Sequence, residues 1–384
     1  MDIIKIVLTG GPAGGKTSVL NAIKELSVND VDSKYKNIIH LNGKKIKLIT
    51  VPETATELIS NGITPVEANN VYDFQNILFG VQKSKEELTE QAVRFGYDAD
   101  MCLFIYDRGL LDGRAYLNSK EEFERLVTEN DMEELEILDR YDLVIDLLST
   151  ATCLPQKYSL ENNKARFEEA EWAKSIDYLT STAWVGHRNL KLFKSDIPLQ
   201  KEIDQVINHI KDYITYGIKD NQEKYLIETD PDDFYQYTNE NSRTIQVNNK
   251  YMNFGLPSYL DTILVKRTYR DYSTYFLQVV SNRSNKSVVI GDQKIDELAY
   301  NELLNKNEVI DEVTKTELSF IENNHLFKVS FYEDFTTLEF DRDDVLSLEE
   351  LPKDVRIIEK LDGSLDKSLK NREKVLKKQK SVLI

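Results

Sequence analysis

The stretch Gly10-Gly11-Pro12-Ala13-Gly14-Gly15-Lys16-Thr17 decides the fold of the first half of this 384-residue chain. It fits the pattern G-x-x-x-x-G-K-[ST]. Residues 3–9 before it form an apolar, β-branched run of strand length, and residues 18–26 after it have one apolar helical face, made by Val19, Leu20, Ile23 and Leu26. A Gly-rich turn that ended in Lys-Thr by chance would lack this context. The context favours a phosphate-binding loop between a buried strand and a helix N-terminus.

Such a loop binds phosphate because glycines let the backbone wrap the anion and point successive N–H groups at it. We expect Lys16 to reach the β- and γ-phosphates of a nucleotide and the Thr17 hydroxyl to ligate Mg²⁺. No Asn-Lys-x-Asp sequence is present, so the choice between ATP and GTP stays open. The candidate nucleotide-binding residues are Gly11, Pro12, Ala13, Gly14, Gly15, Lys16, Thr17 and Ser18.

The composition limits the class of protein. A net charge of −17 argues against a general nucleic-acid binder, because a surface without a basic face repels a phosphate backbone. Two cysteines are too few for a disulfide framework and fit a reducing compartment. No window approaches the roughly 18 apolar residues of a membrane span, and no signal peptide is evident. The sequence therefore predicts a cytoplasmic protein without a transmembrane segment.

Three regions follow one another along the chain. Residues 1–214 alternate apolar strand-like runs with helical stretches, which predicts an α/β domain with a parallel sheet and helices on both faces. Residues 215–364 contain short runs of β-branched and aromatic residues between polar turns, with one helix near 296–305, which predicts a mainly antiparallel β-barrel or tunnel-like domain. Residues 365–384 form a basic tail with seven Lys or Arg against two acidic residues. This tail is either an interaction segment or a solvated terminal helix.

The ends of two predicted strands carry further candidates. Asp107 ends the apolar run 101–106, where a P-loop protein holds Mg²⁺ through water, and Arg108 follows directly. A structural ion pair between the strand end and the next loop is the alternative for these two residues. Glu53 follows the strand 46–51, at the edge of a parallel sheet where ligands bind. Glu53 is therefore either a general base for an acceptor hydroxyl or a cap of the next helix.

A further candidate lies in the sequence Asn162-Asn163-Lys164-Ala165-Arg166, which precedes a Glu-rich helical stretch. A lid at this position would bring Arg166 onto the transferring phosphoryl group, where it would stabilise charge and exclude water. A solvated helix start is the alternative. With Lys16, Glu53, Asp107 and Arg108, this residue completes the predicted catalytic set.

Five separated motifs in this order resemble the AAA-type ATPase domain shared by NadR-like nicotinamide-riboside kinases and translocation-defect proteins: residues 6–12, 51–58, 106–112, 162–166 and 183–187. The Asp107-Arg108 pair is also similar to that of thymidylate and deoxynucleoside kinases. The resemblance implies binding of a nucleoside triphosphate with Mg²⁺ by residues 10–17, with Asp107, Arg108 and Arg166 near the phosphates. The family includes both kinases and nucleotide-binding switches.

The region after residue 214 resembles a CYTH-like triphosphate-tunnel domain in a degenerate form. The tunnel pattern E-x-E-x-K reads D-x-Q-x-K at residues 220–224, and in the run 263–267 only Arg267 is in register with the expected arginines. Two acids on one strand face, Glu339 and Asp341, are kept. The loss of cations argues against triphosphatase or cyclase activity. A smaller anionic head group could still bind at Lys224, Arg243, Lys266, Arg267 and Arg270, and a barrel kept for packing is the alternative.

Two functions follow from these observations. The first is binding of a nucleoside triphosphate with hydrolysis or phosphoryl transfer to a small-molecule acceptor. The second is a nucleotide-gated module whose CYTH-like domain holds an anionic phospholipid or a protein partner.

Overall fold

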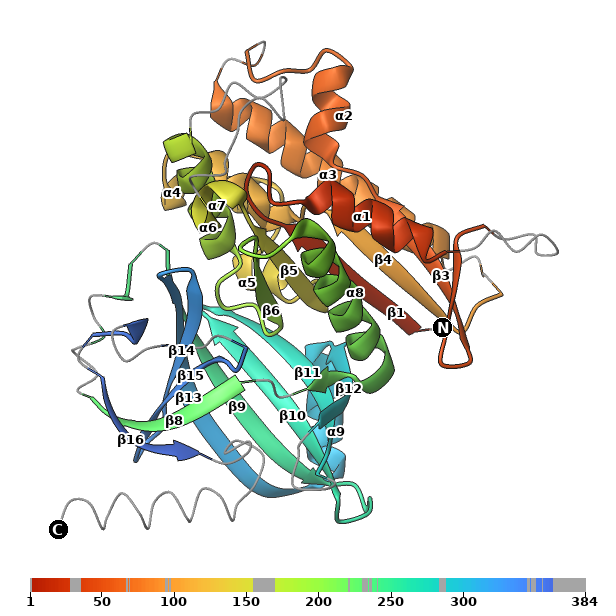
Figure 1. Ribbon diagram of the computed structural model, residues 1–384. Coiled ribbons are helices and arrows are strands. Elements are labelled where there is room, and N and C mark those ends of the chain that lie inside the picture. Colours follow the sequence, from red (N-terminus) through yellow and green to blue (C-terminus); the bar gives the residue numbers. More distant parts are fainter. Residues whose placement is uncertain are drawn as a thin grey trace. The chain divides into compact units, whose positions relative to one another are not determined.

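The chain divides into two compact units, Met1–Thr215 and Tyr216–Ile384 (Figure 1). The computed structural model describes residues 2–27, 36–66, 68, 70–93, 96, 98–154, 170–219, 222–229, 234, 237–239, 241–282, 288–343, 346, 350–353 and 355–361. The predicted lid at residues 162–166 and the basic tail at 365–384 lie outside the described residues.

The described part of the first unit contains a six-stranded sheet in the order β2-β3-β4-β1-β5-β6. Neighbouring strands from β3 to β6 run parallel, whereas β2 pairs antiparallel with β3. The sheet is therefore mixed. The sequence predicted a parallel sheet and did not include the antiparallel edge strand β2. The pair Asn42-Gly43 is a sequence signal for this edge, because Asn-Gly favours a tight hairpin turn. In the structure these residues have φ of 51° and 76°, as such a turn requires. The strands are β1 (Asp2–Thr9), β2 (Ile38–Leu41), β3 (Lys44–Val51), β4 (Met101–Asp107), β5 (Leu143–Leu148) and β6 (Leu190–Lys194).

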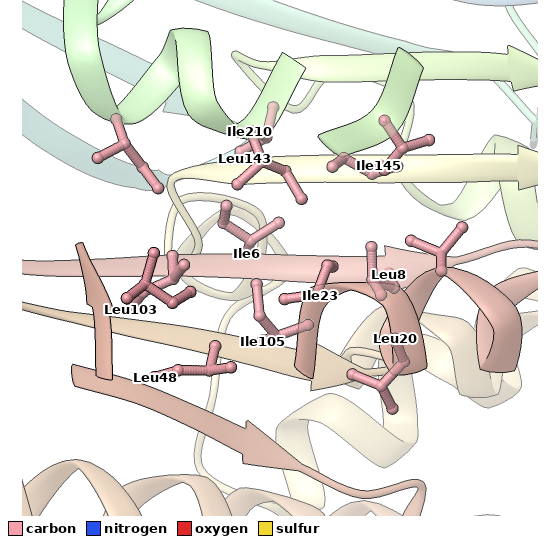
Figure 2. Close-up of a cluster of buried hydrophobic side chains, with 14 of the residues drawn as sticks. Ile6, Leu8, Leu20, Ile23, Leu48, Leu103, Ile105, Leu143, Ile145 and Ile210 are labelled. Atoms are coloured by element: carbon pink, nitrogen blue, oxygen red, sulfur yellow. The ribbon is translucent and has the colours of Figure 1, made fainter. Parts of the chain in front are cut away.

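One face of this sheet packs against α1 (Lys16–Glu25) and α8 (Leu199–Tyr216). Figure 2 shows Leu20 and Ile23 of α1 and Ile210 of α8 directed at aliphatic side chains of the strands. Alternate residues of each strand point to this face, as the pleat requires. Each buried aliphatic side chain stabilises the fold by about 1.5–3 kcal/mol relative to exposure. The strand residues of this core are Ile6, Leu8, Ile46, Leu48, Leu103, Ile105, Leu143, Ile145 and Leu147, among others.

The opposite face carries a row of aromatic side chains. Tyr106 stacks on Phe104 with ring centroids 5.9 Å apart, and it meets the edge of Tyr141 at 5.5 Å. Tyr141 in turn meets Trp184 edge-on at 5.5 Å. The helices and turns of the rest of this unit are α2 (Thr54–Ser60), α3 (Val71–Val93), η1 (Leu110–Tyr116), α4 (Lys120–Glu129), α5 (Glu134–Leu138), α6 (Thr150–Cys153) and α7 (Ala170–Ala183).

Two separate helices follow η1 along the chain, because α4 ends at Glu129 and α5 begins only at Glu134. Asp131 between them has φ of 51°, which a helix cannot accommodate.

The described part of the second unit holds a ten-stranded sheet in the order β16-β8-β15-β14-β13-β9-β10-β11-β12-β7. Every recorded pair in it is antiparallel, so the predicted antiparallel domain is confirmed. The sheet order begins at β16 and ends at β7, and closure into a barrel stays a prediction. The predicted helix near 296–305 is α9 (Glu297–Lys306). The strands are β7 (Ile218–Lys219), β8 (Gln222–Glu228), β9 (Arg243–Asn253), β10 (Leu260–Tyr269), β11 (Tyr272–Ser281), β12 (Val288–Ile295), β13 (Glu308–Glu322), β14 (His325–Phe331), β15 (Thr336–Asp341) and β16 (Arg356–Leu361).

No helix in the described part of either unit is both long enough and apolar enough to cross a membrane.

Candidate functional site

The loop of residues 10–15 joins β1 to α1 and lies against the backbone of β5. A Cβ atom at Gly10 would lie 2.1 Å from the Leu147 carbonyl oxygen, and one at Gly14 would lie 2.3 Å from the same oxygen. Gly10 and Gly15 also have φ of 128° and 78°, a region that favours glycine. The glycines of the motif are therefore required by the path of the loop along β5.

The N-terminus of α1 is suited to an anion. Its N-cap residue is Gly15, which offers no side-chain cap, and the first turn contains no acidic residue. The first N–H groups of the helix thus keep both their hydrogen-bonding capacity and the positive end of the helix dipole for a ligand. Ala13 and Thr17 are exposed at this end, so a phosphate can approach.

Lys16 is buried under the loop. Its Nζ donates hydrogen bonds of 2.7 Å to the carbonyl oxygens of Gly10 and Gly11. Burial, and next the nearby Arg108 guanidinium, lower the pKa of Lys16 from 10.5 to about 7, although Glu53 opposes this shift. The ammonium is therefore held in a water-poor place, where a bound phosphate would favour its charged form.

Arg108 directly follows β4 and lies between two carboxylates, Glu53 after the end of β3 and Asp112 in η1. Its Nε donates to Glu53 Oε1 at 2.6 Å, and its Nη1 lies 3.5 Å from Asp112 Oδ2. Arg108 has φ of 72°, a left-handed conformation that costs roughly 1–2 kcal/mol in a residue with a Cβ. The turn after β4 is thus strained. In this conformation the Arg108 guanidinium contacts Glu53 and Asp112.

Glu53 is held as a carboxylate. Its Oε2 accepts a hydrogen bond of 2.6 Å from the Thr56 hydroxyl, in addition to the bond from Arg108. Burial raises the pKa of Glu53, but Arg108 and Thr56 outweigh burial and the pKa falls below its ordinary value. Glu53 occupies the N-cap position of α2, yet its side chain makes no capping hydrogen bond. The Glu53 carboxylate therefore does not cap α2 by a hydrogen bond.

The predicted metal ligands have the right chemistry for Mg²⁺. Asp107 ends β4 and is partly buried, and Thr17 is exposed at the start of α1. Carboxylate and hydroxyl oxygens are hard ligands, and Mg²⁺ in nucleotide sites takes most of its other ligands from phosphates and water. Among the described residues no group of three His, Cys, Asp or Glu side chains forms a metal site of its own. The residues present fit a metal that arrives with the nucleotide.

Two buried aspartates, Asp112 and Asp177, hold parts of this site, and a third, Asp146, is buried beside Thr9. Asp112 Oδ1 accepts from the Thr9 hydroxyl at 2.7 Å and from Trp184 Nε1 at 2.6 Å. Asp177 Oδ1 accepts from the Gly11 N–H at 2.7 Å, which ties the loop to α7. Asp146, in register with Thr9, is fully buried, and neither of its carboxyl oxygens has a hydrogen-bond partner among the described residues. These aspartates come from elements far apart in the chain, so only the fold brings them together.

In the second unit, three of the five residues predicted for an anion site share one face of the sheet. Across five strands, Lys224 pairs in register with Glu339, then Lys328, Ser319 and Arg243. A second set in register crosses three strands, with Arg267 opposite Val247 and Val247 opposite Lys315. Side chains in register on antiparallel strands share a face, and those two residues apart on one strand do so as well. Buried members of this face include Lys224, Arg243, Arg267, Lys315, Glu339, Ser319, Ser330 and Thr337.

Lys266 does not belong with them. It pairs with Tyr275 of β11, and its Nζ lies 5.8 Å from the centre of that ring, on the face that packs against α9. The prediction of Lys266 in the same anion site as Arg267 is wrong, because adjacent residues of a strand point to opposite faces. Arg270 has φ of 55° in the hairpin turn and lies over Tyr269, 5.2 Å from its ring centre.

The sequence prediction missed Lys315 and Lys328, which also lie on this polar face. Lys315 Nζ contacts Glu317 Oε1 at 2.7 Å, and Lys224 Nζ lies 3.3 Å from Glu339 Oε2. Despite burial, Lys315 and then Lys328 lower the pKa of Glu317 to about 2, so its carboxylate stays ionised. The alternation of Lys315, Glu317 and Ser319 was the signal that could have revealed this face. In the buried part of this face, Lys224, Arg243, Arg267 and Lys315 outnumber the carboxylates Glu317 and Glu339, and we call this buried cluster the positive face.

Comparison with known proteins finds a family match in the first unit. Residues 5–193, just under half of the chain, match the family model described as an AAA domain. This match shows what the first unit is similar to. No curated protein matches the chain.

The chain is also similar to solved structures of low identity. They include the PH1819 protein of Pyrococcus horikoshii OT3, with 15% identity over 41% of this chain and 88% of that chain and a TM-score of 0.25. The PH1012 protein of the same organism has 14% identity over 35% of this chain and 94% of that chain, also with a TM-score of 0.25. A conserved hypothetical protein from Pyrococcus furiosus has 18% identity over 34% of this chain and 80% of that chain, with a TM-score of 0.24.

The pKa of Lys16 predicts how nucleotide affinity depends on pH. Phosphates bind the charged form of Lys16, and free protein loses that charge as the pH rises through about 7. The association constant for a magnesium nucleotide should therefore fall about tenfold per pH unit above pH 7. Isothermal titration calorimetry with excess Mg²⁺, between about pH 7 and pH 9, measures this. A constant affinity over that range would contradict the placement of Lys16 at the phosphates.

The pKa of Asp146 predicts a pH-dependent stability. Burial, and next Asp177, raise the pKa of Asp146 from 3.8 to about 8, so the folded protein keeps this proton up to about pH 8, whereas the unfolded chain releases it near pH 4. The stability that the proton provides is therefore full below about pH 4 and is lost as the pH rises through 8. Asp146→Asn should leave stability at pH 4 nearly unchanged and increase it at pH 8, by up to about 1.4 kcal/mol per pH unit between these values. Urea unfolding followed by tryptophan fluorescence reports this, because both tryptophans, Trp172 and Trp184, lie in the first unit. Parallel stability curves for variant and parent would refute it.

Proposed function

We propose that the first unit binds ATP or GTP with Mg²⁺ at residues 11–18 and transfers the γ-phosphoryl group to a small-molecule acceptor or to water. One observation carries this proposal. The P-loop, Glu53 and Arg108 follow β1, β3 and β4, which are adjacent in the order β3-β4-β1. The carboxyl ends of adjacent parallel strands meet at one edge of the sheet, where open α/β sheets bind their ligands.

The roles of the residues follow from their positions. Lys16 neutralises the β- and γ-phosphates once it exchanges the Gly10 and Gly11 carbonyl oxygens for phosphate oxygens. Thr17 and Asp107 would hold Mg²⁺, Thr17 by direct contact and Asp107 through water. The bound Mg²⁺ would neutralise charge that develops on the phosphate oxygens. The backbone N–H groups of the loop and of α1 orient the triphosphate chain.

Glu53 and Arg108 would act on the acceptor side. Glu53 is an ionised carboxylate, so it can take the proton of an acceptor hydroxyl as that oxygen attacks the γ-phosphorus. Arg108 holds Glu53 in place through Nε, and its remaining N–H groups can stabilise charge on the transferring group. A base whose pKa lies below its ordinary value is weak, so we expect turnover to be slow. Arg166 is proposed to join this set from the lid.

The P-loop assignment is tested by Lys16→Ala. Loss of the ammonium should lower the affinity for magnesium nucleotide at least about a hundredfold, or about 3 kcal/mol, and abolish turnover. Lys24→Ala is the matched control, because Lys24 is an exposed lysine in the last turn of the same helix. Calorimetry and phosphate release with ATP and GTP, with and without a panel of nucleosides and ribosides, measure both effects. Parent-like binding and turnover in Lys16→Ala would remove the proposed site.

A second function is favoured by the positive face of the second unit. There we propose a CYTH-like site for an anionic head group, gated by the nucleotide state of the first unit. Ser330 Oγ and Thr337 Oγ1 support it, because they are buried, face each other in register and have no hydrogen-bond partner among the described residues. Next to them, Glu317 is in register with Ser330 and adjoins Lys315. Unused hydroxyl groups beside buried cations suit phosphate oxygens.

The difference between Arg267 and Lys266 tests this second function. Arg267→Ala should weaken binding of inorganic tripolyphosphate, or of vesicles that contain phosphatidylinositol phosphate, about tenfold or more. Lys266→Ala removes the same charge from the opposite face and should change binding less than twofold. Calorimetry with tripolyphosphate and vesicle co-sedimentation separate a free polyphosphate from a lipid head group. Equal losses in both variants, or no binding by the parent protein, would overturn the assignment.

A further inference from the structure

A buried carboxylate on α3 lies at the centre of a hydrogen-bond network that the proposed reaction does not use. Glu86 is fully buried and accepts hydrogen bonds from three side chains. Tyr141 Oη donates to it at 3.0–3.1 Å, Arg140 Nε at 3.0 Å and Gln82 Nε2 at 3.2 Å. Arg140 lies beside Glu86, and both carboxyl oxygens of Glu86 have partners, as a buried carboxyl group requires.

Two members of this network also bind the backbone of the turn that carries Arg108. Gln82 Nε2 donates a second hydrogen bond, of 3.2 Å, to the Arg108 carbonyl oxygen. Tyr141 Oη, which donates to Glu86, accepts a hydrogen bond of 3.2 Å from the Leu110 N–H. The network therefore holds the turn at residues 108–110 on both sides of Gly109.

We propose that Gln82, Glu86 and Tyr141 are positioning residues, which hold residues 108–110 in the conformation that directs the Arg108 guanidinium at Glu53. The proposal rests on the proposed function of the first unit, because it gives the network a role in phosphoryl transfer. None of the three side chains needs to touch nucleotide or acceptor. They act through the backbone of the turn.

The conformation of Arg108 explains why a support is needed. With φ of 72°, Arg108 is in a left-handed conformation that a residue with a Cβ adopts only where its surroundings impose it. Rotation of Arg108 to an ordinary φ would redirect its side chain away from Glu53 and Asp112. The Gln82 bond lies on the peptide group directly after Arg108, which such a rotation would turn, and the Tyr141 bond holds the next peptide group, after Gly109. Gln82 and Tyr141 both donate hydrogen bonds to Glu86, so Glu86 orients the two side chains that bind the turn.

A neighbouring pair offers a matched control. Tyr106 Oη donates to Glu90 Oε1 at 2.9 Å, and Glu90 lies one helical turn after Glu86 on α3. Tyr106 and Tyr141 are both buried, and their rings contact each other. Tyr106→Phe therefore removes a buried hydroxyl group from a similar environment without removing a hydrogen bond to the turn.

Hydrogen exchange tests the support without any need for turnover. In Tyr141→Phe the Leu110 N–H loses its acceptor, so its exchange in a peptide covering residues 108–117 should be at least about tenfold faster than in the parent. Tyr106→Phe should exchange like the parent there. Gln82→Ala, which removes the other bond, should also speed exchange in this peptide if Tyr141→Phe does not fold. Unchanged exchange in Tyr141→Phe, or the same increase in Tyr106→Phe, would overturn the proposal.

A double-mutant cycle then tests whether the support acts through Arg108. Tyr141→Phe should lower kcat about tenfold and leave KM for the nucleotide within about twofold. In an Arg108→Ala background the same substitution should lower kcat less than twofold, because the group that it positions is already gone. The same tenfold loss in both backgrounds would show a general structural effect and overturn the proposal. A parent protein without turnover would instead refute the proposed function, and the exchange measurement would still decide on the support of the turn.

Discussion

The close approach of the P-loop backbone to β5 is the constraint on which the rest of the first unit depends. At Gly10 and Gly14 the loop lies so near the Leu147 carbonyl oxygen that a Cβ atom would overlap it. Asp177 holds the same loop from the other side through the Gly11 N–H. These contacts set where Lys16 and the N-terminus of α1 lie, and therefore where a phosphate can bind. A loop with larger side chains could keep the strand and the helix but would lose the site between them.

The charged groups at this edge of the sheet are paired within the protein. Arg108 is shared by Glu53 and Asp112, and Lys16 bonds to carbonyl oxygens of its own loop. Pairing of this kind stabilises the empty site, because an isolated buried charge would cost several kcal/mol. It also holds each charged atom close to where a phosphate or an acceptor would meet it. Preorganisation of this kind makes the electrostatic part of phosphoryl transfer effective.

Much of the first unit could be predicted from local sequence, because its signals are local. The run 3–9, the glycines of the loop and the acids after two strands each lie within a few residues of the feature that they create. The pairing of Arg108 with Glu53 depends instead on strand order, and the contacts of Asp112, Asp146 and Asp177 depend on which distant elements pack together. No pattern along the chain encodes those contacts. The edge strand β2 was predictable from its Asn-Gly turn and was missed.

The second unit shows how one residue of register decides a site. Lys266 and Arg267 are neighbours in sequence, but the pleat of β10 sends one to the face against α9 and the other to the positive face. A list of basic residues could not separate them, whereas the alternation of Lys315, Glu317 and Ser319 on β13 could have located the polar face. Sequence patterns therefore predict a β-sheet site only when the parity of each strand is used together with its composition.

Both units thus present cations that already have partners inside the protein. Lys224 contacts Glu339 and Lys315 contacts Glu317, as Arg108 contacts Glu53. A phosphate that enters either site does not meet bare charges but competes with carboxylates or carbonyl oxygens for hydrogen bonds. Its net gain is the difference between two sets of strong contacts, which is smaller than either set alone. Selectivity then depends on geometry, since only a ligand whose oxygens match several donors at once can replace the internal partners.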